Sequence, residues 1–266
     1  MTMTTTTSLA DQLPALGVRA TAAQLDDLIA RATTHRWSTT QLLEHVVQSE
    51  LDERARHGLA RRLSRAKLGR FQPIAAFDWA WPKKIDRIAG ESALRLDFIA
   101  QARTVVLVAP QGLGQTMIAQ NIGHQAVLAG HSVRFVTASQ LLLDLAAQDS
   151  ARTLDRRLRH YGTRTTVLIV DEIGYLSSDS RNADLRFQVV SRRHETRSLV
   201  RTTTLAFRDW ASIFPNAGSA VALIARVIHH ADLLAIEGES YRLREAEQAL
   251  KNKGAAKPRP PKGAAT

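Results

Sequence analysis

The stretch VVLVAPQGLGQTMIAQ, residues 105–120, contains the strand, the loop and the helix start that decide the fold. A β-branched run leads into a loop with Gly112 and Gly114, and Thr116 then opens an amphipathic segment. Glycines permit unusual φ angles and close backbone approach, and the N–H groups at a helix start favour an anion. This order is typical of a phosphate-binding loop, although the usual pattern G-x-x-x-x-G-K-[ST] has a lysine where this chain has Gln115.

A second motif follows at residues 165–176, TTVLIVDEIGYL, where an apolar strand runs directly into two acids. Asp171 is placed to hold Mg²⁺, directly or through water, and Thr116 is placed to ligate the same ion. Glu172 is placed to orient and polarise an attacking water. The alternative, two acids that end a strand at the surface, fits poorly with acids directly after VLIV. Both motifs in this order predict a P-loop nucleotide-binding fold.

Strand and helix patterns alternate through the second part of the chain. The expected strands are 104–109, 132–138, 165–170, 198–204 and 232–238. The expected helices are 115–129, 139–148, 151–162, 181–197 and 219–230. Near-continuous apolar strands that alternate with helices predict an α/β fold with a parallel sheet covered by helices on both faces.

A small all-α domain is expected before this sheet. Ser38 with Gln41 predicts a capped helix start, and apolar residues then recur every four positions, with Gly58 as a possible kink. Pro73 and Pro82 argue against a helix in the next segment. The expected organisation is a disordered leader at 1–8, a helical domain at 9–70, an ordered linker at 71–90, the nucleotide-binding domain at 91–250 and a disordered basic tail at 251–266.

The charge of the chain points to a polyanionic partner. Lysine and arginine outnumber aspartate and glutamate by 36 to 25, which gives a net charge of +11. Such an excess favours nucleic acid, and the alternative is a solvated arginine-rich surface. The end of the first domain is strongly basic, and it is either a phosphate-contacting surface or a solvated helix face. The candidate DNA contacts there are Arg54, Arg61, Arg62, Arg65, Lys67 and Arg70.

Several classes of protein are disfavoured. The chain has no cysteine, its N-terminus lacks a signal-peptide pattern, and its apolar runs are too short for a membrane span, so we expect a cytoplasmic protein without a membrane partner. His229 and His230 lack further ligands at suitable spacing, which favours a structural role over a metal site. Trp79 and Trp81 could stack on bases, but packing on the core is the expected role.

From about residue 20 to residue 248 the chain resembles the IstB-type transposition helper ATPases of insertion sequences. This AAA+ family is related to the DnaC helicase loaders and the DnaA initiator. The motifs that carry the resemblance are FDWAWPKKIDR, APQGLGQT, VLIVDEIGYL, LAFRDW, ARVIHHAD and GESYRLRE. The resemblance implies an ATP-dependent protein that binds double-stranded DNA, forms a homo-oligomer on it and assists a transposase. A DnaC-like helicase loader is an alternative.

The resemblance also implies roles for particular residues. Arg226 matches an arginine finger that acts on a neighbouring subunit's nucleotide, Thr204 occupies the sensor-1 position, and Arg242 falls near sensor 2. The loop implies a set of nucleotide contacts: Ala109, Pro110, Gln111, Gly112, Leu113, Gly114, Gln115, Thr116 and Met117. The chain departs from the family pattern at four positions: Ala109 for glycine, Gln115 for lysine, Thr204 for asparagine and Ala225 for aspartate.

Gln115 is the departure with the clearest chemical consequence. Glutamine can donate a hydrogen bond to a phosphate but carries no charge, and a charge-assisted bond is roughly twice as strong as a neutral one. The sequence therefore predicts weak ATP binding and poor hydrolysis. Decay of a transposon copy, selection against hydrolysis and a lost need for nucleotide are three origins that stay open. A non-catalytic DNA-binding AAA+ scaffold is an alternative function.

Overall fold

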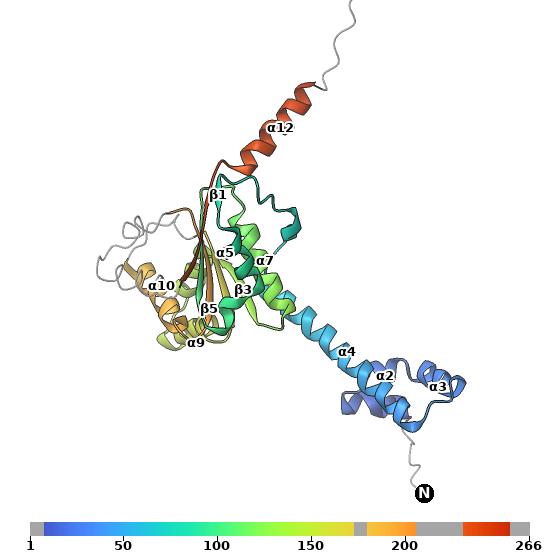
Figure 1. Cartoon of the computed structure of the whole chain (residues 1–266). Helices are drawn as coiled ribbons and strands as arrows, with labels where there is room; N and C mark the ends of the chain where they lie inside the picture. The colour runs from blue at the N-terminus through green and yellow to red at the C-terminus, as the bar shows by residue number, and fades with distance from the viewer. Residues whose placement is uncertain (1–7, 173–179, 206–230, 256–266) are drawn as a thin grey trace, which may run out of the picture. The chain divides into compact units, whose positions relative to one another are not determined.

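The computed structural model describes residues 8–172, 180–205 and 231–255 (Figure 1). The chain divides into two compact units, Met1–Arg61 and Arg62–Thr266, and the boundary lies inside a helix. The predicted domain end at residue 70 lies beyond this boundary. Predictions that lie outside the described residues concern the leader 1–7, the helix 219–230 with Ala225, Arg226, His229 and His230, and the tail 256–266.

The first unit is helical, as predicted. It comprises α1 (Leu9–Gln12), the 3₁₀ helix η1 (Leu13–Leu16), α2 (Arg19–Ala23), α3 (Leu25–Thr34) and most of α4 (Thr39–Ala66). The predicted capping pair precedes α4, because the Ser38 N–H donates to Gln41 Oε1 at 2.8 Å and the Gln41 N–H donates to Ser38 Oγ at 3.3 Å. The helix continues through Gly58 without interruption.

A buried carboxylate holds the first unit together. The Thr21 N–H donates to Glu50 Oε1 at 2.8 Å, and this bond lowers the pKa of Glu50. The apolar stripe of α4 is not covered over its first half, because Leu43, Val47 and Leu51 are 58%, 56% and 51% exposed. Within the described residues this stripe is therefore part of the surface of the first unit.

The second unit is built on a six-stranded sheet in the order β1-β6-β2-β5-β4-β3. Its strands are β1 (Lys84–Ile85), β2 (Thr104–Val108), β3 (Val133–Thr137), β4 (Val167–Asp171), β5 (Ser198–Thr203) and β6 (Ala231–Glu237). Every pair is parallel except β1 with β6. The predicted strands are therefore confirmed within a residue or two at each end, and β1 adds an antiparallel edge.

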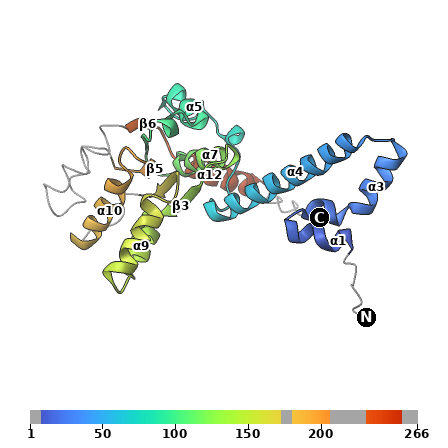
Figure 2. The same ribbon diagram turned by 90° about the horizontal axis from the view of Figure 1, so that it is seen from below.

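Helices cover both faces of the sheet, as predicted. The helices are α5 (Arg87–Arg95), α6 (Asp97–Ala100), α7 (Gln115–Leu128), α8 (Ala138–Ala146), α9 (Ala151–Gly162), α10 (Ser180–Arg193) and α12 (Tyr241–Ala255). Figures 1 and 2 show α5 and α7 on one side of the strands and α9 and α10 on the other. Within the described ranges, no helix combines the length and apolar character needed to cross a lipid bilayer.

Two boundaries differ from the sequence prediction. The segment 71–90 was predicted to be a linker without helix, but it contains the 3₁₀ helix η2 (Ile74–Ala76), β1 and the start of α5. Pro82 prevents a helix only in its immediate neighbourhood. Four residues later Asp86 caps the start of α5. The tail prediction is wrong for residues 251–255, which complete α12. The preceding residues are good helix formers, and the first proline follows only at Pro258.

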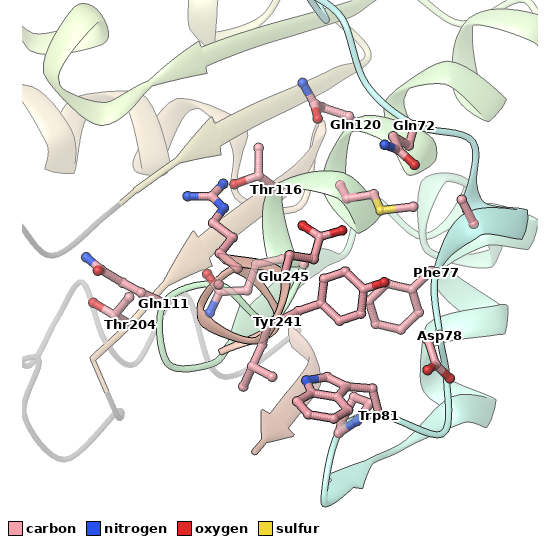
Figure 3. A pocket seen from close by; sticks show the side chains of 18 of the residues that line it. Gln72, Phe77, Asp78, Trp81, Gln111, Thr116, Gln120, Thr204, Tyr241 and Glu245 are labelled. Atoms are coloured by element: carbon pink, nitrogen blue, oxygen red, sulfur yellow. The ribbon is translucent and has the colours of Figure 1, made fainter. Parts of the chain in front are cut away.

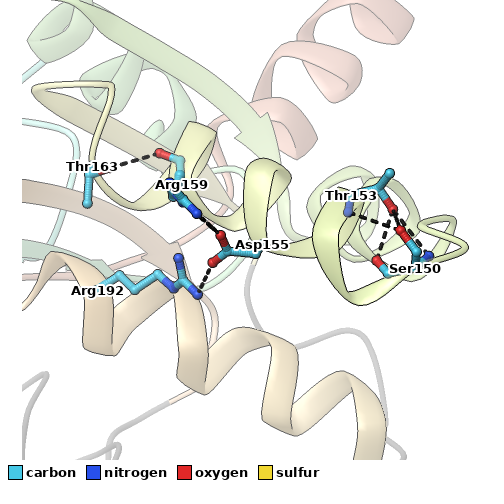
Figure 4. A network of polar contacts seen from close by, with 6 residues as sticks. All are labelled: Ser150, Thr153, Asp155, Arg159, Thr163 and Arg192. Carbon is cyan, nitrogen blue, oxygen red and sulfur yellow. Dashed lines mark hydrogen bonds and ion pairs between the residues drawn. The ribbon is translucent and has the colours of Figure 1, made fainter.

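Polar contacts fix α9 and α10 at the amino ends of β4 and β5. Asp155 accepts hydrogen bonds from Arg159 and Arg192, which lowers the pKa of Asp155 (Figure 4). Arg193 is 1% exposed, and its two terminal nitrogens donate to main-chain oxygens. Its guanidinium donates to the carbonyls of Tyr161, Gly162, Thr165, Thr166 and Ser198. Arg193 thus joins two helices to two strands, and no acidic partner for it lies within the described residues.

Candidate nucleotide-binding site

The two sequence motifs meet at the carboxyl end of the sheet. Thr116 Oγ1 lies 3.1 Å and 3.0 Å from the two carboxylate oxygens of Asp171. Asp171 is 4% exposed, and its Oδ1 also accepts a hydrogen bond from the Thr202 hydroxyl. The predicted hydroxyl and carboxylate pair is therefore in contact, with β5 between the strands that carry the two motifs.

The loop before α7 has the backbone conformation of a phosphate-binding loop. Gly112 and Gly114 have φ angles of 80° and 85°, and Gly114 is the N-cap of α7. A Cβ at Gly114 would lie 2.6 Å from the Phe77 ring, and one at Gly112 would collide with the Ser240 hydroxyl. Both positions therefore require glycine for φ and for space, and the loop N–H groups lie at the positive end of a helix.

Gln115 is held by the backbone of its own site. Its Nε2 donates to the Ala109 carbonyl at 2.5 Å and to the Thr203 carbonyl at 3.0 Å. The Ala109 N–H also donates to the Thr203 carbonyl, at 3.1 Å. An amide nitrogen has two hydrogens, so these two bonds use its full donor capacity. In this arrangement Gln115 clamps the start of the loop to the end of β5 and has no hydrogen left for a phosphate.

Glu172 and Thr204 face the same space. The Glu172 N–H donates to Thr202 Oγ1 at 2.9 Å, and Glu172 adopts a left-handed backbone with φ of 61°. That conformation is uncommon for a residue with a side chain, so local contacts hold Glu172 against strain. Thr204 is half-buried just after β5. The third predicted catalytic residue, Arg226, lies outside the described residues.

A pocket of about 490 Å³ lies over the loop and contains most of the predicted site residues. The predicted residues that line it are Gln111, Gly112, Leu113, Gly114, Gln115, Thr116, Met117, Glu172, Thr204 and Arg242. Ala109 and Asp171 are buried next to it, and Pro110 is exposed. Figure 3 shows Gln111, Thr116 and Thr204 towards one side and the rings of Phe77, Trp81 and Tyr241 towards the other.

The pocket wall includes residues that the sequence did not predict as contacts. They come from the segment 71–90 and from the start of α12: Gln72, Ala76, Phe77, Asp78, Trp81, Pro82, Tyr241 and Glu245. Trp81 was expected to pack on the core, but it lines the pocket, whereas Trp79 packs on Phe77 and Gly90. The high density of aromatic residues in FDWAWP is the feature of the sequence that could have predicted this wall.

Asn121 of α7 fastens the segment 71–90 beside the loop. Its Oδ1 accepts from the Ile74 N–H at 2.9 Å, and its Nδ2 donates to the Gln72 carbonyl at 2.9 Å. Asn121 is only 3% exposed, so each of these polar groups needs its partner. The helix that follows the phosphate loop therefore also positions the aromatic wall of the pocket.

The start of α12 closes the pocket from the other side. The Tyr241 N–H donates to the Gly112 carbonyl at 2.9 Å. Trp81 Nε1 donates to the Glu239 carbonyl at 2.9 Å, and the Arg244 guanidinium lies 4.2 Å from the centre of the Trp81 ring. This cation–π contact and the hydrogen bonds hold the C-terminal segment against both the loop and the aromatic wall.

The charges around the pocket are unusual for a phosphate site. Asp78, Glu172 and Glu245 are acidic, and Arg242 is the only lysine or arginine among the described residues of the wall. The oxygen donors of Thr116 and Asp171 suit Mg²⁺, and the glycine loop suits a phosphate. The residues present therefore fit a nucleotide with its metal, but the cation normally supplied by the loop is missing.

The strand order, the glycine loop at the end of β2 and the acid at the end of β4 define a P-loop domain of the AAA+ class. The chain belongs to the family of IstB-like ATP binding proteins, because the model of that family matches residues 11–249. The similarity thus extends through both units.

Individual relatives agree with this family. The chain is 33% identical to the ATP-binding protein of insertion sequence IS21 from Pseudomonas aeruginosa, over 85% of this chain and 84% of the relative. It is 32% identical to that of IS5376 from Geobacillus stearothermophilus, over 80% and 85%. Domain III of the Thermotoga maritima replication initiation protein DnaA has a similar fold, with a TM-score of 0.52 and 18% identity over 70% of this chain and 77% of that domain.

The space beside Gly114 gives a prediction about stability. Gly114→Ala should lower the free energy of unfolding by about 3 kcal/mol, because it combines a left-handed φ with a collision against Phe77. Gly130→Ala is the matched control, since Gly130 has a φ of 92° with no atom within 4 Å of an added Cβ. It should cost about 1 kcal/mol. Urea unfolding measures both, and equal losses would show that the Phe77 contact carries no cost.

Proposed function

We propose that this chain is an ATP-dependent DNA-binding helper of transposition. It assembles on double-stranded DNA and assists a transposase, and Gln115 weakens its ATP hydrolysis. The contact between Thr116 and Asp171 beside the glycine loop is the observation that carries the nucleotide part of this proposal. Membership of a family named for ATP binding, with relatives in insertion sequences, supports the link to transposition.

Each residue of the site has a defined role in this proposal. Thr116 and Asp171 would hold Mg²⁺, which would neutralise phosphate charge. Glu172 orients and polarises the attacking water, and Thr204, at the sensor-1 position, helps to position it. Arg242 supplies positive charge to the phosphates. The aromatic side of the pocket, with Phe77 and Tyr241, takes the base by stacking.

Gln115 affects the chemical step more than binding. The backbone N–H groups and the oxygen ligands for the metal remain in place, so ground-state contacts survive. Charge that develops on the transferred phosphoryl group lacks its lysine, and the loss of one such donor costs about 3–4 kcal/mol in the transition state. We therefore expect the protein to bind ATP and to hydrolyse it slowly.

A non-catalytic DNA-binding scaffold is the second candidate function. It is favoured by the two hydrogen bonds of Gln115 to the Ala109 and Thr203 carbonyls, because they hold the loop together without nucleotide. The two candidates differ in whether the unaltered chain has steady-state ATPase activity.

We predict that Gln115→Lys raises steady-state ATP turnover about 100-fold, since it restores one electrostatic donor. Glu172→Gln in that background should abolish turnover and spare binding, because this carboxylate acts only in the chemical step. Turnover is measured by phosphate release and binding by titration with a fluorescent nucleotide.

The control for this prediction concerns Thr204. If Gln115→Lys binds ATP more tightly but stays slow, the double variant Gln115→Lys with Thr204→Asn tests sensor 1. A double variant that binds ATP no better than the unaltered chain would contradict the assignment of this loop as a phosphate site. The non-catalytic scaffold would then be the remaining candidate function.

DNA binding is proposed for the basic segment 54–70. Of the six candidate residues, Arg54, Arg61, Arg65, Lys67 and Arg70 are exposed. Arg62 is half-buried, and its Nε donates to the Val127 carbonyl at 3.3 Å. The exposed cations are free to contact phosphates without sequence preference, whereas Arg62 also has a structural role.

We predict that replacing Arg65, Lys67 and Arg70 together by glutamine flattens the dependence of duplex affinity on salt. The slope of log K against log salt should fall by about 2–3, because each lost phosphate contact removes about 0.9. Fluorescence anisotropy with labelled duplex DNA, at salt concentrations from about 50 to about 300 mM, measures this slope. The control replaces three exposed arginines in and just after α9, Arg152, Arg156 and Arg164, with the same loss of charge. Equal slopes in the two variants would show that net charge, not this segment, determines binding.

Self-assembly is proposed through Arg226, whose guanidinium suits the phosphates of a nucleotide held by a neighbouring subunit. ATP and duplex DNA together should promote oligomers, and Arg226→Ala should reduce them while DNA binding by the monomer persists. Multi-angle light scattering measures the mass. A monomer at high protein concentration with ATP and DNA present would refute this part of the proposal.

A further inference from the structure

Two buried arginines outside the nucleotide site lie at one small cavity. Arg186 of α10 and Arg201 of β5 are 5% and 4% exposed, and both line a space of about 10 Å³ on the sheet face covered by α8 and α10. The other residues of its wall are apolar: Ala138, Leu141, Val170, Val189, Val190 and Leu199.

The two guanidinium groups lack the partners that such groups normally have. All three nitrogens of Arg186, and Nε and Nη1 of Arg201, are buried without a hydrogen-bond partner in the part of the chain that the structure describes. Among the described residues, the cavity wall contains no acidic residue. Arg193, buried to a similar degree, donates instead to five carbonyls. The fold thus gives both terminal nitrogens of Arg193 carbonyl partners and leaves only its Nε without one, whereas at this cavity most of the guanidinium nitrogens lack partners.

Arginine side chains are protonated at neutral pH, and both guanidinium groups here are buried. Burial, with a further contribution from the neighbouring Arg186 charge, lowers the pKa of Arg201 to about 9. Burial also lowers the pKa of Arg186. Two like charges in an apolar shell repel each other strongly, because the surroundings screen them poorly. A negative charge between them would remove the repulsion and satisfy the orphan N–H groups.

We propose that Arg186 and Arg201 form a binding site for one small inorganic anion, with chloride as the ion. The cavity has room for about one water-sized sphere, so it suits a monatomic ion better than a polyatomic one. Chloride is slightly larger than water, so the two long arginine side chains must move outward slightly to admit it. Phosphate and nucleotide groups are too large for it. The site is distinct from the nucleotide pocket, and it does not depend on the proposed function.

The anion site is coupled to the nucleotide site through β5. Arg201 directly precedes Thr202, whose hydroxyl donates to Asp171. Successive side chains of a strand point to opposite faces, so Arg201 and Thr202 connect the two faces of the sheet. An ion that fixes Arg201 therefore also steadies the strand that bonds to the metal-binding carboxylate.

Thermal unfolding tests the proposal with sodium chloride and sodium gluconate at matched ionic strength. The melting temperature of the unaltered protein should rise in chloride, by about 4 °C when chloride reaches ten times its dissociation constant. The double variant Arg186→Met, Arg201→Met should lose this dependence and melt at a higher temperature in gluconate, because methionine keeps an unbranched stem without the charge. The control Arg152→Met, Arg156→Met removes two exposed charges and should keep the chloride dependence.

Bromide provides a direct test on the unaltered protein. A crystal grown in sodium bromide should show an anomalous difference peak between the two guanidinium groups. A chloride response that is equal in the unaltered protein and the Arg186/Arg201 variant would overturn the proposal. If that variant does not fold, the bromide map decides, and a map without a peak at this cavity would overturn it too.

Discussion

The parallel register of β2, β5 and β4 is the constraint on which the site depends. Val108 pairs with Thr203, and Val170 pairs with Arg201, so the three strands end at the same edge of the sheet. A shift of one residue in β5 would turn Thr202 to the opposite face and away from Asp171. Buried contacts far from the pocket, such as those of Arg193 at the start of β5, therefore determine the geometry of the site.

The sheet and the two motifs were predictable because their signals are local. Apolar β-branched runs predicted the strands, and Gly112 with Gly114 predicted the loop. The aromatic wall was not predictable in the same way, because it depends on contacts between residues far apart in the chain. Trp81 meets Glu239 and Arg244 there, and Asn121 fixes the backbone at residues 72 and 74. The edge strand β1 is only two residues long, too short for a periodic pattern.

The sequence also could not show how Gln115 and the buried arginines are accommodated. The identity of residue 115 shows that it lacks a charge. Only the folded structure shows that the Gln115 amide donates to the Ala109 and Thr203 carbonyls. Arg201 interrupts an apolar strand, and the pattern alone does not separate an arginine that donates to five carbonyls, such as Arg193, from one whose buried nitrogens lack partners. Burial and hydrogen bonding, which are properties of the folded chain, make that distinction.

The position of Trp81 has an optical consequence. Its indole lies in the pocket wall, donates to the Glu239 carbonyl and has the Arg244 guanidinium over its ring. The emission of an indole depends on the polarity and the charges beside it, and a base that stacks in the pocket would alter both. Trp81, one of four tryptophans in the chain, is therefore placed so that its fluorescence would change when a base enters the pocket, without a label attached to the protein or to the nucleotide.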